Sequence, residues 1–142
     1  CSIPYGKALF FPLVNIEWDN VAVNPPQTIP EIRAYAKGVI DTVTELHATI
    51  DGVPVPNLSS YRVAAGPFAY VLPANDNIYQ YFGLSVPGSD WPSTVVQPAL
   101  SDGYWLFVNP LPVGVHTIKF GGTEGAPYNF STDVTYTITV TP

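Results

Sequence analysis

Apolar and polar residues alternate strictly near the end of the chain. From Val134 to Val140 every second residue is apolar, and the residues between them are threonines. Because successive side chains of a β-strand point to opposite faces, this pattern predicts a strand over residues 130–140. One face of that strand is expected to lie on a core, and its threonine face is expected to meet solvent or a partner.

A second alternating segment, residues 45–50, predicts another strand. The pair Asp51-Gly52 follows it directly and is expected to form a turn. Residues 53–56 then read Val-Pro-Val-Pro. They predict an extended segment that cannot be a central strand, because proline donates no backbone hydrogen bond.

The apolar run Tyr104–Val108 and the segment 115–120 predict the two arms of an antiparallel hairpin. Asp102-Gly103 is expected to form a turn before the first arm. A second turn is predicted between the arms, over residues 109–114, which contain Pro110, Pro112 and Gly114. The first arm is apolar on both faces, so we expect a central strand that is covered on each side.

Shorter apolar segments predict the remaining strands. They are residues 8–11, which end at Pro12, and residues 61–64 and 68–72, which Gly66-Pro67 separates. Two stretches are typical of loops, residues 16–27 and the long, irregular stretch 73–99. Long loops in a small domain commonly carry function, so we expect function in the second stretch.

One segment has helical periodicity. Residues Thr28 to Glu31 match a capping box, and apolar residues then recur at helical spacing, which predicts one short helix near residues 29–43. Seven or eight strands with frequent turns predict an all-β fold in a single domain over residues 1–142. The expected architecture is an antiparallel β-sandwich of the immunoglobulin-like or jelly-roll type.

Composition restricts the environment and the partners. The chain is 46% hydrophobic and 13% aromatic, which excludes disorder. Only 11% of its residues are charged, so the surface must be polar but largely uncharged, which suits a secreted protein that is extracellular or at the cell surface. A net charge of −6 argues against nucleic acid as a partner. No apolar run approaches the roughly 20 residues that a membrane span requires, so we expect no span.

The single cysteine of the chain is Cys1, so we expect no internal disulfide. Three roles stay open for it. It is a lipid attachment site, or one half of a disulfide to an upstream segment or another chain, or an incidental free thiol.

Aromatic residues in the loop-like stretches are the strongest signal for binding. Such rings either cover a core or form a contact surface. Flat rings beside polar groups suit the apolar faces of sugars, and buried Tyr or Trp is equally expected in protein interfaces. The candidate residues for binding a glycan or a protein surface are Trp18, Tyr79, Tyr81 and Trp91, with Phe82 beside them.

Metal chemistry has a weaker signal. His47 and His116 are the only histidines, and each falls inside an expected strand. With one carboxylate they would make the two-histidine, one-carboxylate arrangement that binds iron. A structural role for each histidine is the stronger interpretation, because their spacing is not diagnostic of a metal site.

Hydrolytic chemistry is also poorly supported. Glu17 and Asp19 would form a glycosidase pair with Asp90 or Asp102, but the chain has eleven acidic residues and therefore many such pairings. No nucleophile motif is present. We therefore assign no catalytic residue and no cofactor.

Six motifs extend over most of the chain. They are C-S-I-P-Y-G-K-A-L-F-F-P-L-V-N at residues 1–15, D-G-V-P at 51–54, Y-R at 61–62, S-D-G-Y-W at 101–105, P-L-P-V-G-V-H-T-I-K-F-G-G at 110–122 and V-T-Y-T-I-T-V at 134–140. With them the chain resembles an uncharacterised family of secreted bacterial proteins. Members carry a further tryptophan-rich, cysteine-bearing segment before the position of Cys1. The resemblance therefore implies the later part of a longer precursor, favours a disulfide from Cys1 to that segment, and implies no activity.

The leading prediction is a secreted, non-catalytic β-sandwich module that binds a glycan or a protein surface through its loop aromatics. The alternative is an extracellular structural subunit that assembles with copies of itself, as a filament or surface layer, through a strand edge or the threonine face. A metal-dependent enzyme that uses His47 or His116 is the third interpretation.

Overall fold

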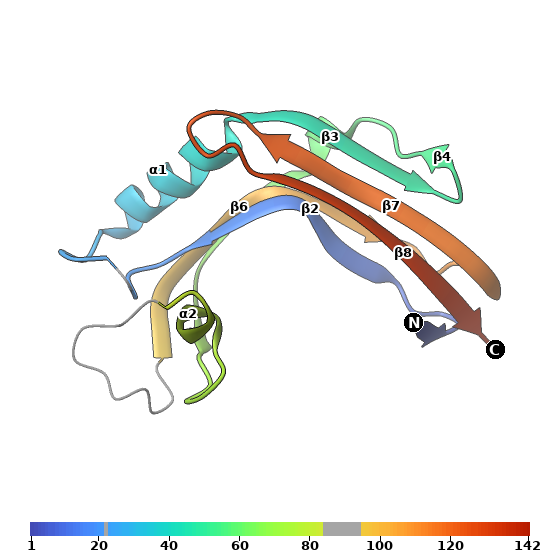
Figure 1. Cartoon of the computed structure of the whole chain (residues 1–142), viewed down its shortest axis with the longest axis horizontal. Helices are drawn as coiled ribbons and strands as arrows, with labels where there is room; N and C mark the ends of the chain where they lie inside the picture. The colour runs from blue at the N-terminus through green and yellow to red at the C-terminus, as the bar shows by residue number, and fades with distance from the viewer. Residues whose placement is uncertain (22, 84–94) are drawn as a thin grey trace. The chain divides into compact units, whose positions relative to one another are not determined.

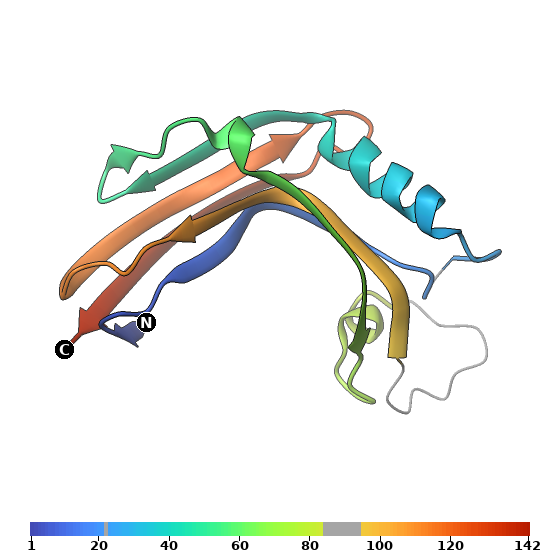
Figure 2. The ribbon, with the colours of Figure 1, turned by 180° about the vertical axis from the view of Figure 1, so that it is seen from behind.

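The computed structural model of the chain describes residues 1–21, 23–83 and 95–142 (Figure 1, and from behind in Figure 2). The chain divides into two units. The first unit comprises Cys1–Ile16, Gly38–Val63 and Asp102–Pro142, and the second comprises Glu17–Lys37 and Ala64–Ser101. Three strands and one helix contribute residues to both units.

A five-stranded sheet lies in the first unit (Figure 1). Its strand order is β1-β8-β7-β3-β4. All neighbours pair antiparallel except β1, which pairs parallel to β8. The strands are β1 Ser2–Pro4, β3 Val43–Ile50, β4 Val53–Pro54, β7 Gly114–Glu124 and β8 Ser131–Thr141.

The alternating pattern of residues 134–140 is confirmed as one apolar and one threonine face. Ile138 and Val140 of β8 are buried in a core with Ile118 of β7 and Ala48 of β3. The threonines of β8 point to the opposite face, where Thr137 lies opposite a threonine of β7. The sheet therefore turns an apolar face to the core and a threonine-rich face away from it.

The turn predicted at Asp51-Gly52 is also confirmed. Both residues have positive φ angles, 52° and 79°, and Ile50 pairs with Val53 across them. This is the backbone that a two-residue hairpin turn requires, and aspartate and glycine tolerate it best. The short strand β4 that follows lies at the edge of the sheet, as its prolines predict.

A second sheet has three strands in the order β2-β6-β5. Strand β2 is Leu9–Trp18, β5 is Arg62–Val71 and β6 is Val95–Val108. The apolar run in β6 is central in this sheet, as expected, but the prediction that both of its faces are covered is wrong, because Phe107 is 66% exposed. The predicted hairpin is wrong, because β6 pairs in this sheet whereas the next strand, β7, pairs in the five-stranded sheet. The connection, residues 109–113, contains two prolines, whose missing N–H groups prevent a ladder from starting there.

The turn predicted at Asp102-Gly103 is also wrong, because both residues lie inside β6. Asp102 is buried and binds a guanidinium group. At Gly103 a Cβ atom would lie 2.5 Å from the Cβ of Asn15 on β2. Close approach of another strand, and not a turn, therefore explains this glycine.

Other boundaries differ from the prediction as well. Strand β2 runs through Pro12 as far as Trp18, and β5 runs through Gly66-Pro67 without a break. The stretch 73–99, expected to be irregular, contains a four-residue helix, α2, at Ile78–Tyr81 and the first residues of β6. In β2 and β5, pairing with neighbouring strands outweighs the tendency of Pro12 and of Gly66-Pro67 to end a strand.

The predicted helix near residues 29–43 is present as α1, Ile29–Ile40. Its first turn is fixed by Glu31, whose carboxylate accepts hydrogen bonds from the Thr28 N–H and hydroxyl, each at 2.7 Å. The helix ends three residues before the predicted limit. There the N–H and the hydroxyl of Thr42 both donate to the Val39 carbonyl, and β3 begins at the next residue.

Each unit has its own apolar cluster. In the first, both sheets contribute, because Leu13 of β2 and Leu106 of β6 pack with buried residues of β3, β7 and β8. In the second, a smaller cluster contains Leu72, Val96 and Ala99. The fold is mostly β with two sheets, which confirms the predicted all-β class. Within the described ranges, no helix combines the length and apolar character that crossing a membrane requires.

Candidate functional site

Exposed aromatic side chains lie on the outer face of β2 and β6 in the first unit. Phe10 and Phe107 are each 66% exposed. Trp105 lies two residues before Phe107 on the same face of β6, while Leu106 between them points into the core. We call Phe10, Trp105, Phe107 and the exposed Val63 of β5 the aromatic face; Val63 belongs to it because its neighbour Arg62 points to the other side, towards Asp102.

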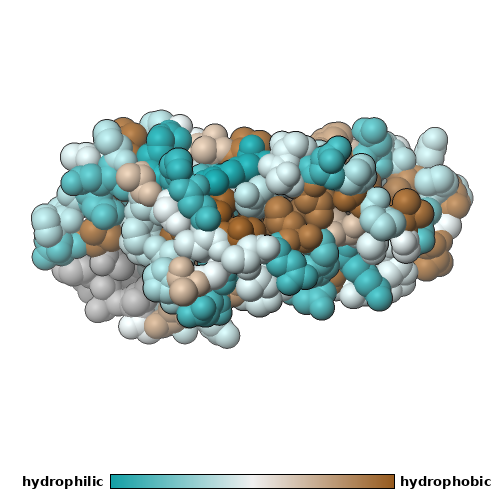
Figure 3. Space-filling model, turned by 90° about the horizontal axis from the view of Figure 1, so that it is seen from above, coloured by the Kyte–Doolittle hydropathy of each residue, from teal (hydrophilic) through white to brown (hydrophobic). Residues whose placement is uncertain are grey.

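Two rings of the aromatic face stack on each other. The centroids of Phe10 and Trp105 are 5.3 Å apart and their planes differ by 8°. Rings this close and parallel cover part of each other's faces and present edges to solvent. Large apolar side chains are exposed elsewhere too, and Figure 3 shows hydrophobic atoms among hydrophilic ones on one side of the molecule.

None of the four residues of the aromatic face is charged. The charged side chains next to it, Arg62 and Asp102, point to the opposite side of the sheet. Arg62 donates to both carboxylate oxygens of Asp102, at 3.0 and 2.8 Å, and to Asp41 at 2.7 Å. These bonds raise the pKa of Arg62 further, so its charge is permanent. Arg62 thus compensates the buried Asp102 and joins β5 to β6 on the core side.

The second unit contains a partly buried acid–tyrosine cluster, which consists of the buried Asp19 and the half-buried Glu17, Tyr70 and Tyr79. The Asp19 carboxylate accepts hydrogen bonds from the Tyr79 hydroxyl at 2.5 Å, the Tyr70 hydroxyl at 2.8 Å and the Val21 N–H at 2.7 Å. Three donors satisfy the Asp19 carboxylate without any cation in the cluster.

The pKa values in this cluster are shifted. Burial, with the adjacent Asp19 charge as a second cause, raises the pKa of Glu17 to about 7. Burial and the hydrogen bonds also raise the pKa values of Tyr70 and Tyr79. Oxygen Oε1 of Glu17 is buried without a hydrogen-bond partner among the described residues. Glu17 can therefore take up and release a proton near neutral pH.

The predicted glycosidase pairing draws on this cluster, and Glu17 and Asp19 do lie in it together. The third candidate, Asp102, is engaged with Arg62 in the first unit. The fourth candidate, Asp90, lies outside the described residues.

Two of the predicted loop aromatics are built into the fold. The ring of Trp18 stacks on Tyr35 with centroids 4.1 Å apart, and its Nε1 donates to Gln27 at 2.9 Å. Tyr79 is half-buried in the acid–tyrosine cluster. The contacts of Trp18 and Tyr79 are the kind expected of residues that cover a core.

The other two predicted aromatics differ from these. Tyr81 is 82% exposed and makes an edge contact with the exposed Phe82, at a centroid distance of 5.2 Å. Trp91 lies outside the part of the chain that the structure describes. Among the described candidates, Tyr81 and the neighbouring Phe82 are thus the aromatic side chains that are available to a ligand.

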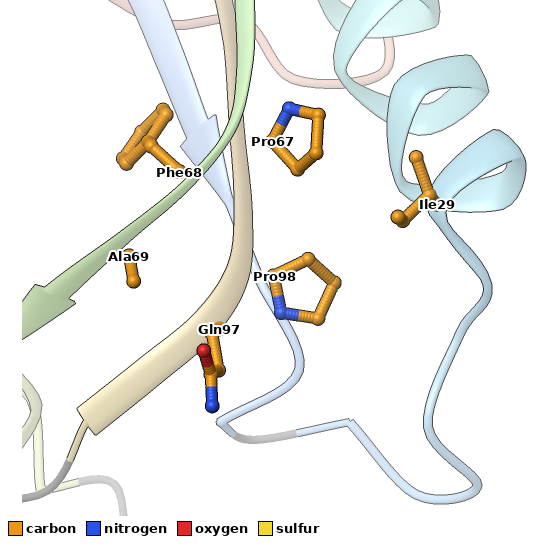
Figure 4. Close-up of a pocket in the computed structure, with 6 residues that line it drawn as sticks. All are labelled: Ile29, Pro67, Phe68, Ala69, Gln97 and Pro98. Carbon is orange, nitrogen blue, oxygen red and sulfur yellow. The ribbon is translucent and has the colours of Figure 1, made fainter.

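An apolar pocket of about 460 Å³ also lies in the second unit (Figure 4). Ile29, at the start of α1, faces Pro67 of β5 and Pro98 of β6 across it. Gln97 is its single amide side chain, and the remaining lining residues are Phe68 and Ala69. The pocket offers apolar contact and few polar groups that could orient a ligand.

The two histidines lie beside different aspartates. His47 Nε2 lies 3.4 Å from Asp133 Oδ1, and His116 Nδ1 lies 2.7 Å from Asp51 Oδ2. They lie on adjacent strands, but His47 pairs in register with Gly121, an odd number of residues from His116, so their side chains point to opposite faces of the sheet. In the described part of the chain, no three His, Cys, Asp or Glu side chains come together as a metal site.

The surroundings of His116 favour its cationic form. Its Nε2 lies 2.8 Å from the Pro112 carbonyl oxygen and its Nδ1 lies 2.7 Å from Asp51 Oδ2, so a protonated ring can donate to both acceptors. Hydrogen bonding to Asp51 raises the pKa of His116 and lowers that of Asp51. Asp51 also accepts the Thr117 N–H at 2.8 Å, which ties the β3–β4 turn to β7.

Cys1 lies exposed at the start of β1. Its backbone N donates to the Thr137 carbonyl at 3.2 Å, and its own carbonyl accepts from the Thr139 N–H at 2.9 Å. Lipid attachment and disulfide formation at this thiol both stay predictions.

The sequence interpretation missed the aromatic face and the partners of Asp19 and Asp102. Strand alternation does indicate the aromatic face, since Phe10, Trp105 and Phe107 alternate with residues that point into the core. In a run that is apolar throughout, however, the alternation does not show which of the two faces is covered. In comparisons with protein-family models, curated proteins and solved structures, nothing matched the chain.

Proposed function

We propose that the chain is an extracellular, non-catalytic module of the β-sandwich type that binds a protein partner through its aromatic face. The stacked rings of the exposed Phe10 and the half-buried Trp105, with the exposed Phe107 beside them, carry this proposal. The low share of charged residues, 11%, supports the extracellular setting. The core shared by residues of both sheets supports the sandwich.

The residue composition of the aromatic face is typical of the buried centre of a protein–protein interface. Such centres are depleted of charged residues and enriched in aromatic ones, and exposed apolar patches on soluble proteins commonly mark interaction sites. The aromatic face has three aromatic residues and a valine, while Arg62 and Asp102 beside it point inward. A partner would therefore bury apolar surface there without desolvating a charge.

The stacked geometry favours a protein over a glycan. A sugar ring stacks on an open aromatic face and adds hydrogen bonds from neighbouring polar side chains. Phe10 and Trp105 cover part of each other's faces, and Phe107 and Val63 offer no hydrogen bonds. Ring edges and methyl groups pack well against the side chains of another protein.

Site-specific photo-crosslinking tests the proposal. The photoreactive residue p-benzoylphenylalanine would replace Phe10 or Phe107. The substituted protein would then be mixed with the proteins of the organism from which the chain comes, and irradiated. We expect both positions to link to the same partner, and the link to be lost when Trp105→Ser is added. The matched control places the residue at Val115, which is 68% exposed on the threonine-rich face.

Two results would contradict the proposal. One is a link of equal yield from position 115, which would show non-specific contact. The other is retention of the protein on microcrystalline cellulose or chitin that Trp105→Ser abolishes, which would identify a glycan as the ligand.

A further inference from the structure

The apolar pocket of the second unit has a cation at one end. Its volume, about 460 Å³, falls within the roughly 300–1,000 Å³ of small-molecule sites. Arg33 lies one helical turn after Ile29, on the same face of α1, and its Nη2 donates to the Gly66 carbonyl at 3.0 Å. Gly66 directly precedes Pro67, which lines the pocket. The Arg33 guanidinium therefore lies at this end of the pocket.

The amide of the pocket, Gln97, lies towards the other end. Arg62 bonds to Asp102, whereas a Cβ at Gly66 would lie 2.8 Å from the Ala99 carbonyl oxygen. Residue numbers thus rise along β5 as they fall along β6, so the two strands run antiparallel. Gln97 is two residues from Ala99, towards the start of β6. At roughly 3.3 Å per residue, about 7 Å along the strands therefore separates Gln97 from the residue that binds Arg33.

The surface between Arg33 and Gln97 is apolar. Figure 4 shows Pro67 and Pro98 on one side of the pocket and Ile29 on the other. Proline rings pack well against flat aromatic rings, the complementarity by which aromatic grooves recognise proline-rich peptides. Ile29 is 41% exposed, so the pocket is open to solvent. A flat ring system would therefore enter it and contact apolar groups on both of its faces.

The charges around the pocket favour an anion. None of the lining residues is charged, and Arg33 adds a positive charge beside them. One of the five N–H groups of its guanidinium serves Gly66, and no carboxylate among the described residues forms an ion pair with it. Glu31 lies two residues after Ile29, about 200° around the helix, and so on the opposite side of α1. A carboxylate on a ligand can therefore bind Arg33 directly.

We propose that the pocket binds a small aromatic carboxylate of two fused rings. The rings lie between Ile29 and the two prolines, the carboxylate accepts hydrogen bonds from Arg33, and a hydroxyl group at the far end bonds to the Gln97 amide. Two fused rings with a substituent at each end match the distance between these polar groups. The aromatic face lies in the first unit and is not involved, so this inference does not rest on the proposed function.

The test uses the whole chain, labelled with ¹⁵N, and 6-hydroxy-2-naphthoate as the probe. On titration we expect saturable shifts of the amide signals of Phe68, Ala69 and Gln97, which line the pocket. At the affinity per atom of drug-sized ligands, a probe of about 14 non-hydrogen atoms should bind with a Kd of about 1 mM. The compound 2-naphthol, which lacks the carboxylate, is expected to bind about three- to fivefold more weakly.

Two variants separate the charge from the apolar wall. Arg33→Gln should weaken the binding of 6-hydroxy-2-naphthoate about three- to fivefold and leave the binding of 2-naphthol unchanged. Ile29→Ser removes the apolar side chain opposite the prolines and should weaken the binding of both compounds about fivefold. Lys119→Gln, on a strand of the first unit, makes the same change in net charge as Arg33→Gln. It is the control and should bind both compounds as the natural chain does.

The proposal is overturned if none of these amide signals shifts saturably up to about 10 mM probe. Equal binding of 2-naphthol and 6-hydroxy-2-naphthoate would overturn it as well, because the carboxylate would then not be recognised. Tighter binding of laurate at the same amides would identify a fatty acid as the ligand, and loss of probe binding as protein concentration rises would identify a second copy as the occupant. Either result excludes the aromatic carboxylate.

Discussion

Two buried aspartates, one in each unit, are stabilised in different ways. Asp102 is 4% exposed and is bound through both of its oxygens by the Arg62 guanidinium. Asp19 is 5% exposed and is held by two tyrosine hydroxyls and one backbone N–H. A cation neutralises the first charge, whereas the second is only solvated by neutral donors and has Glu17 beside it. The charge on Arg62 should therefore not change with pH near neutrality, whereas Glu17, beside Asp19, should titrate there.

The largest expected effect is that of Arg62→Met. It leaves Asp102 buried without a cation, and removing one partner of a buried ion pair typically costs about 3 kcal/mol. Urea denaturation at pH 7 measures the loss in the free energy of unfolding. Asp41→Asn is the matched control, since this partner of Arg62 is 43% exposed and should cost less than about 1 kcal/mol. Equal losses for the two variants would contradict the role given to Asp102.

A smaller loss is expected from Tyr79→Phe, which removes the 2.5 Å donor to Asp19. Hydrogen bonds to charged groups contribute about 1.5–3 kcal/mol, and Tyr70 and Val21 still donate to this carboxylate, so we expect about 1.5 kcal/mol. Tyr81→Phe is the control, because its ring is exposed, and should change stability by less than about 0.5 kcal/mol. A Tyr79→Phe protein as stable as the control would show that neutral donors are dispensable here.

The smallest expected change in stability is that of Glu17→Gln, and it tests the difference between the surroundings of Asp102 and those of Asp19. The folded-state pKa of Glu17, about 7, lies above its ordinary value of 4.5. Between those values the folded state holds a proton that the unfolded chain has lost, so stability must fall as pH rises from about 5 through 7. Glutamine cannot ionise. The variant should therefore lose the part of this slope that Glu17 contributes and should be more stable than the natural chain at pH 8, by about 1 kcal/mol.

Denaturation midpoints at pH 5, 7 and 8 would measure that slope. Glu31→Gln is the control, because its hydrogen bonds to Thr28 lower the pKa of Glu31, so the stability that Glu31 contributes changes with pH only in the acidic range. An unchanged slope between pH 5 and 8 in Glu17→Gln would assign the pH response to another group.

The dipeptide Asp-Gly, which occurs at two compared positions of this chain, shows which features can be predicted from the sequence. Asp51-Gly52 forms the predicted turn, because a two-residue reversal is decided by the residues that make it. Asp102-Gly103 was predicted to do the same, yet it lies in the middle of β6. There Asp102 binds Arg62, forty positions away, and Gly103 accommodates Asn15. No local pattern contains those two partners.

A similar limit applies to the binding surface. Alternation identified which residues of β8 face the core, because threonine marks its other face. It could not do so for Tyr104–Val108, where both faces are apolar and only the position of the five-stranded sheet decides which side chains are covered. Trp18 and Tyr79 were expected in an exposed loop, but partners brought by tertiary structure, Tyr35 and Asp19, engage them.

The parallel ladder between β1 and β8 has a consequence for synthesis. Ser2 is translated long before Thr139, its partner in the sheet. At about 5–20 residues per second, roughly ten seconds separate the two on the ribosome. During that interval β1 has no strand to pair with, and when β8 finally emerges its outer edge is entirely open. β1 and an extended segment from elsewhere then compete for the same row of backbone groups, and the one that reaches the edge first occupies it.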